Sequence, residues 1–146
     1  MKQELQTLIF SMNQPFRGGL QSGFYNVSVY DDYFLDSLIG DYLFPDGTNP
    51  DKELINKLQD LFLDLMNSTM EVTPITFPVT TACFCVDENR NILDKNFLKY
   101  ISKKNQKWAF INIYAGESST LSSCCLDGKQ KVLTKDSSGI KYLPIK

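Results

Sequence analysis

The alternation of β-prone runs with helical patterns is the sequence feature that most constrains the fold. The β-prone runs cover residues 24–30, 75–86 and 108–114. The first is rich in alternating aromatic and β-branched residues, and the third is apolar enough for a strand buried on both faces. Because helical segments separate these runs, the strand–helix–strand order favours right-handed parallel crossovers. The sequence therefore predicts an α/β fold.

The helical segments are predicted from the spacing of apolar residues and from capping residues. They cover residues 3–12, 34–39, 50–67 and 94–104. Gly40 closes the second helix, and Asp94 caps the fourth. Asn49 is the predicted N-cap of the third helix, with Pro50 at its first position. The apolar stripe of that helix comprises Leu54, Ile55, Leu58, Leu61, Phe62, Leu65 and Met66.

Pro78 lies inside the second β-prone run. Proline has no N–H group to donate to a strand ladder. We therefore expect this run to form an edge strand or to contain a bulge.

Length and composition indicate one globular domain or part of a larger one. The chain has 146 residues, of which 42% are hydrophobic, 12% aromatic and 22% charged, which excludes disordered and collagen-like proteins. The net charge is -2 and no Lys/Arg cluster interleaves with aromatic residues, so no direct nucleic-acid partner is expected. No apolar run approaches the ~18 residues of a membrane span, and the first residues do not resemble a signal peptide. We therefore expect a cytoplasmic protein with no membrane partner.

The four cysteines fall into two pairs in a chain that contains no histidine. The lack of histidine excludes histidine acid–base chemistry and His-containing zinc sites within this chain. Cys83 and Cys85 alternate on a predicted strand, and we expect them to be small buried hydrophobic residues. With Cys124 and Cys125 adjacent, the spacings fit a four-cysteine zinc site poorly, so no metal site is predicted.

Two groups of polar residues are candidates for substrate binding. The first lies in a glycine-containing loop, where backbone N–H groups and an arginine can approach a phosphate; a plain turn between helix and strand explains it nearly as well. It comprises Arg17, Gly18, Gly19, Gln21 and Ser22. The second lies on β-prone segments, where polar side chains either line a nucleotide pocket or face solvent. It comprises Asn26, Thr80, Thr81 and Asn112.

Charge divides the chain near residue 124. Residues 1–124 contain ten Lys/Arg and fifteen Asp/Glu, a net charge of -5. Residues 125–146 contain five Lys and two Asp, a net charge of +3. We therefore treat 1–124 and 125–146 as two segments of different origin.

Four segments of the sequence are informative together: NQPFRGGLQSGFYNVSVYD at 13–31, GDYLFPDG at 40–47, TFPVTT at 76–81 and LSSCC at 121–125. In this order they resemble the anaerobic, glycyl-radical (class III) ribonucleoside-triphosphate reductases. The resemblance implies that residues 1–124 are a fragment of the family's ten-stranded α/β barrel. The complete enzyme would make deoxyribonucleotides from ribonucleoside triphosphates with a thiyl radical that a glycyl radical generates.

The same resemblance implies cofactors and partners outside this chain. The complete enzyme would need a glycyl radical, installed by an iron–sulfur and S-adenosylmethionine activase, and a structural zinc, but no cofactor is expected in this chain. Its partners would be a ribonucleoside triphosphate and, after assembly, a second subunit in a homodimer. The predicted helix at 50–67 is most simply core packing, although nearby helices of the family form the dimer and effector surface. The chain alone is expected to be inactive as a reductase.

In the reductase family the two cysteines continue into Arg-Leu-Arg, whereas Leu126 follows Cys125 here. The tail contains Cys125, Leu126, Gly128, a first predicted strand with Val132 and Thr134, a turn at 137–139 and a second predicted strand at 140–145. In these features residues 125–146 resemble the N-terminal splicing block of an intein. Lys129 and Gln130 depart from the Asp-Thr that inteins prefer after the glycine. The resemblance implies a short β-hairpin that is an intein N-fragment.

Cys125 is the splicing nucleophile in this hypothesis. Its thiol attacks the carbonyl of Cys124 and converts the peptide bond into a thioester. The chain lacks the Thr-x-x-His element, the terminal Asn and the following Cys, Ser or Thr that splicing needs. Splicing would therefore occur in trans, with a complementary chain that carries the C-terminal intein half and the rest of the reductase. Without an intein, Cys125 would instead be the thiyl-radical cysteine, with Cys124 beside it.

Two other interpretations stay open at this point. One is a non-catalytic nucleotide-binding or regulatory module in which the tail is an ordinary β-hairpin. The other is a decayed gene fragment. The downstream nucleotide sequence discriminates the splicing hypothesis from the binding-module interpretation, because a nearby frame with an intein C-terminal half followed by Cys-Arg-Leu favours splicing.

Overall fold

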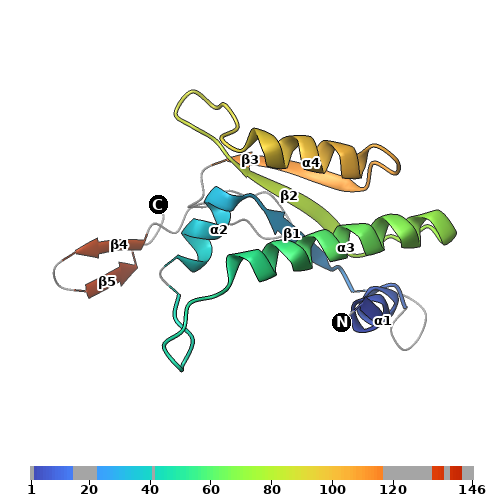
Figure 1. Cartoon of the computed structure of the whole chain (residues 1–146), viewed down its shortest axis with the longest axis horizontal. Coiled ribbons are helices and arrows are strands. Elements are labelled where there is room, and N and C mark those ends of the chain that lie inside the picture. Colours follow the sequence, from blue (N-terminus) through green and yellow to red (C-terminus); the bar gives the residue numbers. More distant parts are fainter. Residues whose placement is uncertain (1, 15–22, 41, 117–132, 137–138, 143–146) are drawn as a thin grey trace.

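The chain folds into a small parallel sheet covered by helices. The computed structural model describes residues 2–14, 23–40, 42–116, 133–136 and 139–142 (Figure 1). The elements run in the order α1, β1, α2, α3, β2, α4, β3, β4 and β5. In the described part of the chain, no helix is both long and apolar enough to cross a membrane. The predicted α/β fold is confirmed.

In the part of the chain that the structure describes, the sheet contains three strands in the order β1-β2-β3, all parallel. They are β1 at Asn26–Tyr30, β2 at Val79–Cys85 and β3 at Ile111–Gly116. The prediction that Pro78 marks an edge strand or a bulge is wrong. Pro78 lies just before β2, which is the central strand of the sheet. Because Pro78 lies outside the strand, its missing N–H group does not interrupt the hydrogen bonds between β2 and its neighbours.

Among the described residues, four helices accompany the sheet. They are α1 at Lys2–Met12, α2 at Asp32–Ile39, α3 at Lys52–Val72 and α4 at Lys95–Asn105. The predicted caps Asp94 and Gly40 are confirmed, and a Cβ on Gly40 would clash with the backbone oxygen of Asp36. The predicted cap at Asn49 is wrong, because Asp51 accepts hydrogen bonds from the backbone N–H groups of Glu53 and Leu54.

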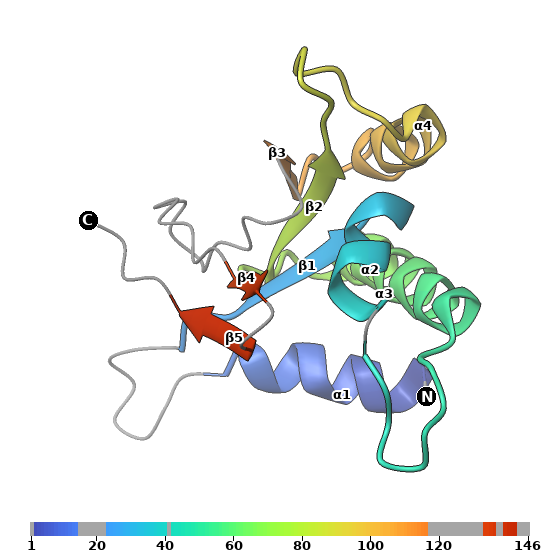
Figure 2. The same ribbon diagram turned by 90° about the vertical axis from the view of Figure 1, so that its left-hand side faces the viewer.

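The main core lies on one face of the sheet, where α1, α3 and α4 all pack (Figure 2). Its fully buried members include Ile9 of α1, Leu63 of α3, Phe84 of β2 and Ile101 of α4. Burying one such side chain contributes about 1.5–3 kcal/mol. This face therefore supplies most of the apolar burial that holds the helices on the sheet.

The apolar stripe predicted for α3 is buried only in its second half. Phe62, Leu65 and Met66 are buried as expected, whereas Leu54 and Leu58 are exposed. Leu58 borders an apolar cavity of about 370 Å³ between α1, β1, α2 and α3. Packing is therefore incomplete beside the first half of α3.

The expectation that the third strand is buried on both faces is wrong. Trp108 is outside β3, and Ile113 within it is 55% exposed. Among the described strands β3 is an outer strand, as β1 is, so Ile113 has a neighbouring strand on one side only.

A separate antiparallel hairpin follows in the tail. Its strands are β4 at Leu133–Asp136 and β5 at Gly139–Tyr142. Two short strands therefore lie in the segment where a hairpin was predicted, and the pairing alone does not assign them to an intein.

Side-chain amides close both outer strands of the three-stranded sheet. Gln59 of α3 accepts a hydrogen bond from Tyr30 N at 2.7 Å and donates to Tyr30 O at 3.2 Å. Asn105 of α4 does the same for Ile111, with distances of 2.8 and 3.1 Å. Each amide thus satisfies the backbone donor and acceptor of one edge residue, as a neighbouring strand would.

Asn13 forms a third such pair just before β2. Its Oδ1 accepts from Phe77 N at 2.9 Å and from Thr76 N at 3.0 Å. Its Nδ2 donates to Phe77 O at 2.5 Å. This contact fastens the end of α1 to the segment that leads into the central strand.

Replacing Gln59 by glutamate should destabilise the fold. The Gln59→Glu side chain keeps an acceptor for Tyr30 N but loses the donor for Tyr30 O. We expect the free energy of unfolding, measured by urea denaturation, to fall by about 1–3 kcal/mol. Gln3→Glu on the exposed surface of α1 is the control and should change it by less than ~0.5 kcal/mol. Equal stabilities for the two variants would contradict a stabilising role for this amide pair.

Candidate functional site

The candidate site is the second face of the sheet, opposite the main core. Side chains alternate along a strand, so residues in register share a face. Ser28, Thr81 and Asn112 form one row across β1, β2 and β3. Asn26 lies two residues before Ser28 on the same face, and its Oδ1 lies 3.5 Å from Thr81 Oγ1. Three of the four predicted strand residues therefore lie together.

Thr80 is the exception and must be removed from the predicted pocket. Its register partners are Val27 and Ile111, so it faces the main core. It is fully buried, and its hydroxyl donates to Pro78 O at 3.4 Å. Thr80 is therefore a core residue with a satisfied hydroxyl, and the adjacent Thr81 faces the site.

Cys83 and Cys85 close the far end of this face. Neither residue is in a disulfide, both are buried, and they pack against Phe34 of α2, as expected for small hydrophobic residues. Burial raises the pKa of Cys83 to about 11, with a smaller opposing effect from a hydrogen bond with Ser28. At neutral pH Cys83 is therefore a protonated thiol and a poor nucleophile.

Asp31 is the residue that the sequence reasoning missed. It is fully buried at the carboxyl end of β1. Its Oδ1 accepts from Phe34 N at 2.8 Å, which caps α2, and its Oδ2 accepts from Cys85 N at 2.7 Å. Burial raises the pKa of the Asp31 carboxyl, and the two backbone hydrogen bonds oppose that effect. An acidic residue directly after a β-prone run and before an apolar helical pattern was the available signal.

The remaining predicted site residues lie outside the described residues. They are Arg17, Gly18, Gly19, Gln21, Ser22, Cys124 and Cys125. The phosphate-loop hypothesis and the assignment of the splicing nucleophile therefore stay predictions.

The described site is suited to binding rather than to catalysis. Asn26, Ser28, Thr81 and Asn112 offer amide and hydroxyl groups that both donate and accept hydrogen bonds. None of these groups changes protonation near neutral pH. Among the residues that the structure describes, no three Cys, Asp or Glu gather into a metal site. The open row can therefore hold and orient a polar ligand.

Comparisons with known proteins give consistent matches. Residues 1–136 match the family model described as anaerobic ribonucleoside-triphosphate reductase. The structure is similar to the anaerobic ribonucleotide reductase from Thermotoga maritima with MES in the active site, with 28% identity, a TM-score of 0.72, and coverage of 85% of this chain and 22% of that chain. The structure is also similar to the Thermotoga maritima enzyme in complex with dATP and CTP, with 30% identity and a TM-score of 0.72. This match covers 84% of this chain and 21% of that chain. Comparison with curated proteins gives no match.

The coverage is strongly asymmetric. The chain accounts for only 22% of the Thermotoga maritima chain while most of its own residues align. It therefore spans about a fifth of the length of the solved structures it matches.

Proposed function

The chain belongs to the anaerobic ribonucleoside-triphosphate reductase family, and we propose that residues 1–124 form part of the catalytic α/β barrel of such an enzyme. The observation that carries the proposal is the three-stranded parallel sheet with its helices, which is similar to about a fifth of a solved reductase. A complementary polypeptide would supply the other strands of a ten-stranded barrel. The assembled cytoplasmic enzyme would convert ribonucleoside triphosphates to deoxyribonucleotides.

In this proposal the open sheet face contributes to nucleotide binding. Asn26, Thr81 and Asn112 project from three neighbouring strands, so their groups can bind ribose hydroxyls and phosphate oxygens at fixed spacing. A relative of this chain is solved in complex with dATP and CTP, which supports a nucleotide ligand. The described residues would bind and orient the substrate, and the reacting cysteine would arrive with the complementary chain.

We assign the cofactors to the complementary chain as well. The described residues offer no cluster of three metal-ligating side chains, so they do not fit a structural zinc. A glycyl radical, installed by an iron–sulfur and S-adenosylmethionine activase, would supply the oxidising equivalent for the thiyl radical. Alone, the chain would be inactive as a reductase; after assembly it would form part of a homodimer.

Trans-splicing at Cys125 is the proposed route of assembly. The hairpin β4–β5 lies in a tail of net charge +3, whereas residues 1–124 carry a net charge of -5. Excision would join Cys124 to a segment that begins Cys-Arg-Leu and restore the family sequence.

The nucleotide-binding proposal predicts a specific kinetic defect. In the assembled reductase, Asn112→Ala should raise the KM for the ribonucleoside triphosphate by up to ~10-fold, because one hydrogen bond is worth about 0.5–1.5 kcal/mol. Asn96→Ala, which removes an exposed asparagine from α4, should leave the KM unchanged. Equal KM values for the two variants would exclude Asn112 from the nucleotide site. Assembly without any ribonucleotide reduction would contradict the proposed function.

A further inference from the structure

The outer face of α4 carries a stripe of lysines. Lys95, Lys99 and Lys103 follow one another at intervals of four residues, and all three are exposed. Each interval advances ~6 Å along the helix axis and turns only ~40° around it, so the three side chains project from one face. We call these three residues the α4 lysine stripe.

The stripe lies opposite the side on which α4 packs. Ile101 is fully buried in the main core, and Phe97 packs against the same core. Both are two positions away from Lys99 in the sequence, which places them ~200° away from it around the helix. Figure 2 shows α4 at the margin of the fold. The stripe therefore faces away from the core.

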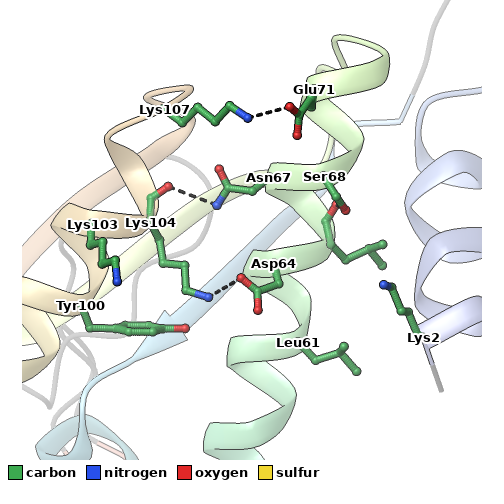
Figure 3. A pocket seen from close by; sticks show the side chains of 11 residues that line it. Lys2, Leu61, Asp64, Asn67, Ser68, Glu71, Tyr100, Lys103, Lys104 and Lys107 are labelled. Carbon is green, nitrogen blue, oxygen red and sulfur yellow. Dashed lines mark hydrogen bonds and ion pairs between the residues drawn. The ribbon is translucent and has the colours of Figure 1, made fainter.

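The lysines that face α3 are already paired within the fold. Lys104 pairs with Asp60 at 2.8 Å and also with Asp64. Lys107 pairs with Glu71 at 2.8 Å. Figure 3 shows both lysines reaching across to α3. The α4 lysine stripe, in contrast, forms no ion pair among the residues that the structure describes.

The stripe opposes the stability of its own helix. Like charges at i and i+4 repel each other, and the stripe contains two such pairs in succession. Lys95 also lies in the first turn, where the partial positive charge of the helix N-terminus disfavours a cation. Asp94 is the only acidic residue between 94 and 107, and its Oδ1 accepts a hydrogen bond from Phe97 N at 2.8 Å. An anionic partner would relieve this repulsion.

The composition of the outer face favours carboxylates of a protein as that partner. Besides the lysines, the face carries Asn96 and Ser102, which are polar. A helix that lies in a membrane interface needs a free apolar face, and the apolar side of α4 is packed in the core. Nucleic-acid surfaces combine basic residues with aromatic side chains that stack on bases, whereas Phe97 and Tyr100 both pack inward.

A second helix can match the stripe charge by charge. Acidic residues at i, i+4 and i+8 of that helix have the same rise of ~6 Å between neighbours. Opposite charges in register steer the encounter and fix the orientation of two surfaces. We propose that the α4 lysine stripe docks an acidic helix of a protein partner, with carboxylates at intervals of four residues.

Two peptides of identical composition test the proposal. Both probes are alanine-based helices of about 20 residues, long enough to be helical alone, with three glutamates and a fluorophore. One carries the glutamates at intervals of four residues, and the other distributes them around the helix. In fluorescence anisotropy at roughly 0.03 M salt, we expect the first peptide to bind the chain ~5-fold more tightly. Raising the salt to roughly 0.3 M should weaken its binding.

Single charge reversals separate binding from folding. Lys95→Glu and Lys99→Glu each place a glutamate at i, i+4 spacing from a lysine, so the midpoint temperature of unfolding should rise by ~2–5 °C. The same variants should bind the matched peptide ~5-fold less tightly. Lys57→Glu makes the same change in net charge on an exposed side chain of α3 and should leave the affinity unchanged.

The proposal is overturned by any of four results. The matched peptide does not bind, or the two peptides bind equally, which would mean that only net charge is recognised. The two stripe variants lose binding together with a lower midpoint temperature, which would assign the lysines to folding. An oligothymidine of equal charge or anionic phospholipid vesicles bind more tightly than the matched peptide, which would assign the stripe to nucleic acid or lipid.

Discussion

A chain carrying Cys125→Ala should give no ligated product when it is mixed with the complementary intein half, whereas the wild-type chain should be spliced. In the proposed splicing reaction the Cys125 thiol attacks the Cys124 carbonyl through a five-membered ring, and alanine has no nucleophile. Proximity of this kind is worth several orders of magnitude in rate, so the loss should be complete within the sensitivity of mass spectrometry. With added thiol, the wild-type chain should also release a piece that ends at Cys124, and the variant should not.

The adjacent cysteine is the matched control for this experiment. Cys124→Ala keeps the carbonyl under attack and removes only a side chain, so splicing should continue. Release after Ser123, or normal ligation by the Cys125→Ala chain, would show that the junction lies elsewhere.

The family match extends to residue 136, eleven residues beyond Cys125. If the reductase sequence simply continued through this point, Cys125 would be a reductase cysteine and no thioester would form. The thiol-induced release after Cys124 therefore distinguishes an intein junction from an uninterrupted reductase.

Local signals were sufficient to predict most of the elements. Asp94 and the apolar residues behind it define α4, and the β-branched run before Asp31 defines β1. These patterns depend on neighbours within a few residues of the chain. The prediction of Asn49 as the N-cap failed because Asp51, two residues later, can also cap a helix, and the outcome depends on which side chain reaches the first free N–H groups.

Contacts between distant segments could not be predicted in the same way. Gln59 and Tyr30 are 29 residues apart, and Asn13 and Phe77 are 64 apart, so composition gives no indication of either amide pair. Of the two adjacent threonines, only the register of β2 against its neighbours places Thr81 on the open face and Thr80 in the core. The sequence shows which residues of a strand share a face of the sheet. Which of the two faces packs against the helices depends on tertiary packing.

Replacing Asp31 by alanine should destabilise the fold strongly. The substitution leaves Phe34 N and Cys85 N without their acceptor at a fully buried position, and it removes the N-cap of α2. Each unsatisfied buried N–H costs about 1–3 kcal/mol, so we expect the free energy of unfolding to fall by about 3–5 kcal/mol in urea titrations. Asp32→Ala, on the exposed start of the same helix, should cost less than ~1 kcal/mol.

The pH dependence gives this prediction a second, independent readout. Burial raises the folded-state pKa of Asp31 above its ordinary value of 3.8, so the folded chain binds this proton more tightly than the unfolded chain does. The stability that the protonated carboxyl contributes is therefore fully present below pH 3.8 and is lost as the pH rises through the higher folded-state pKa. Asp31→Asn keeps one acceptor oxygen and cannot titrate, so relative to the wild type its stability should not show this loss in the same pH window. Parallel stability–pH curves for the wild type and Asp31→Asn would mean that the buried carboxyl keeps its ordinary pKa, and that hydrogen bonding from Phe34 N and Cys85 N fully offsets its burial.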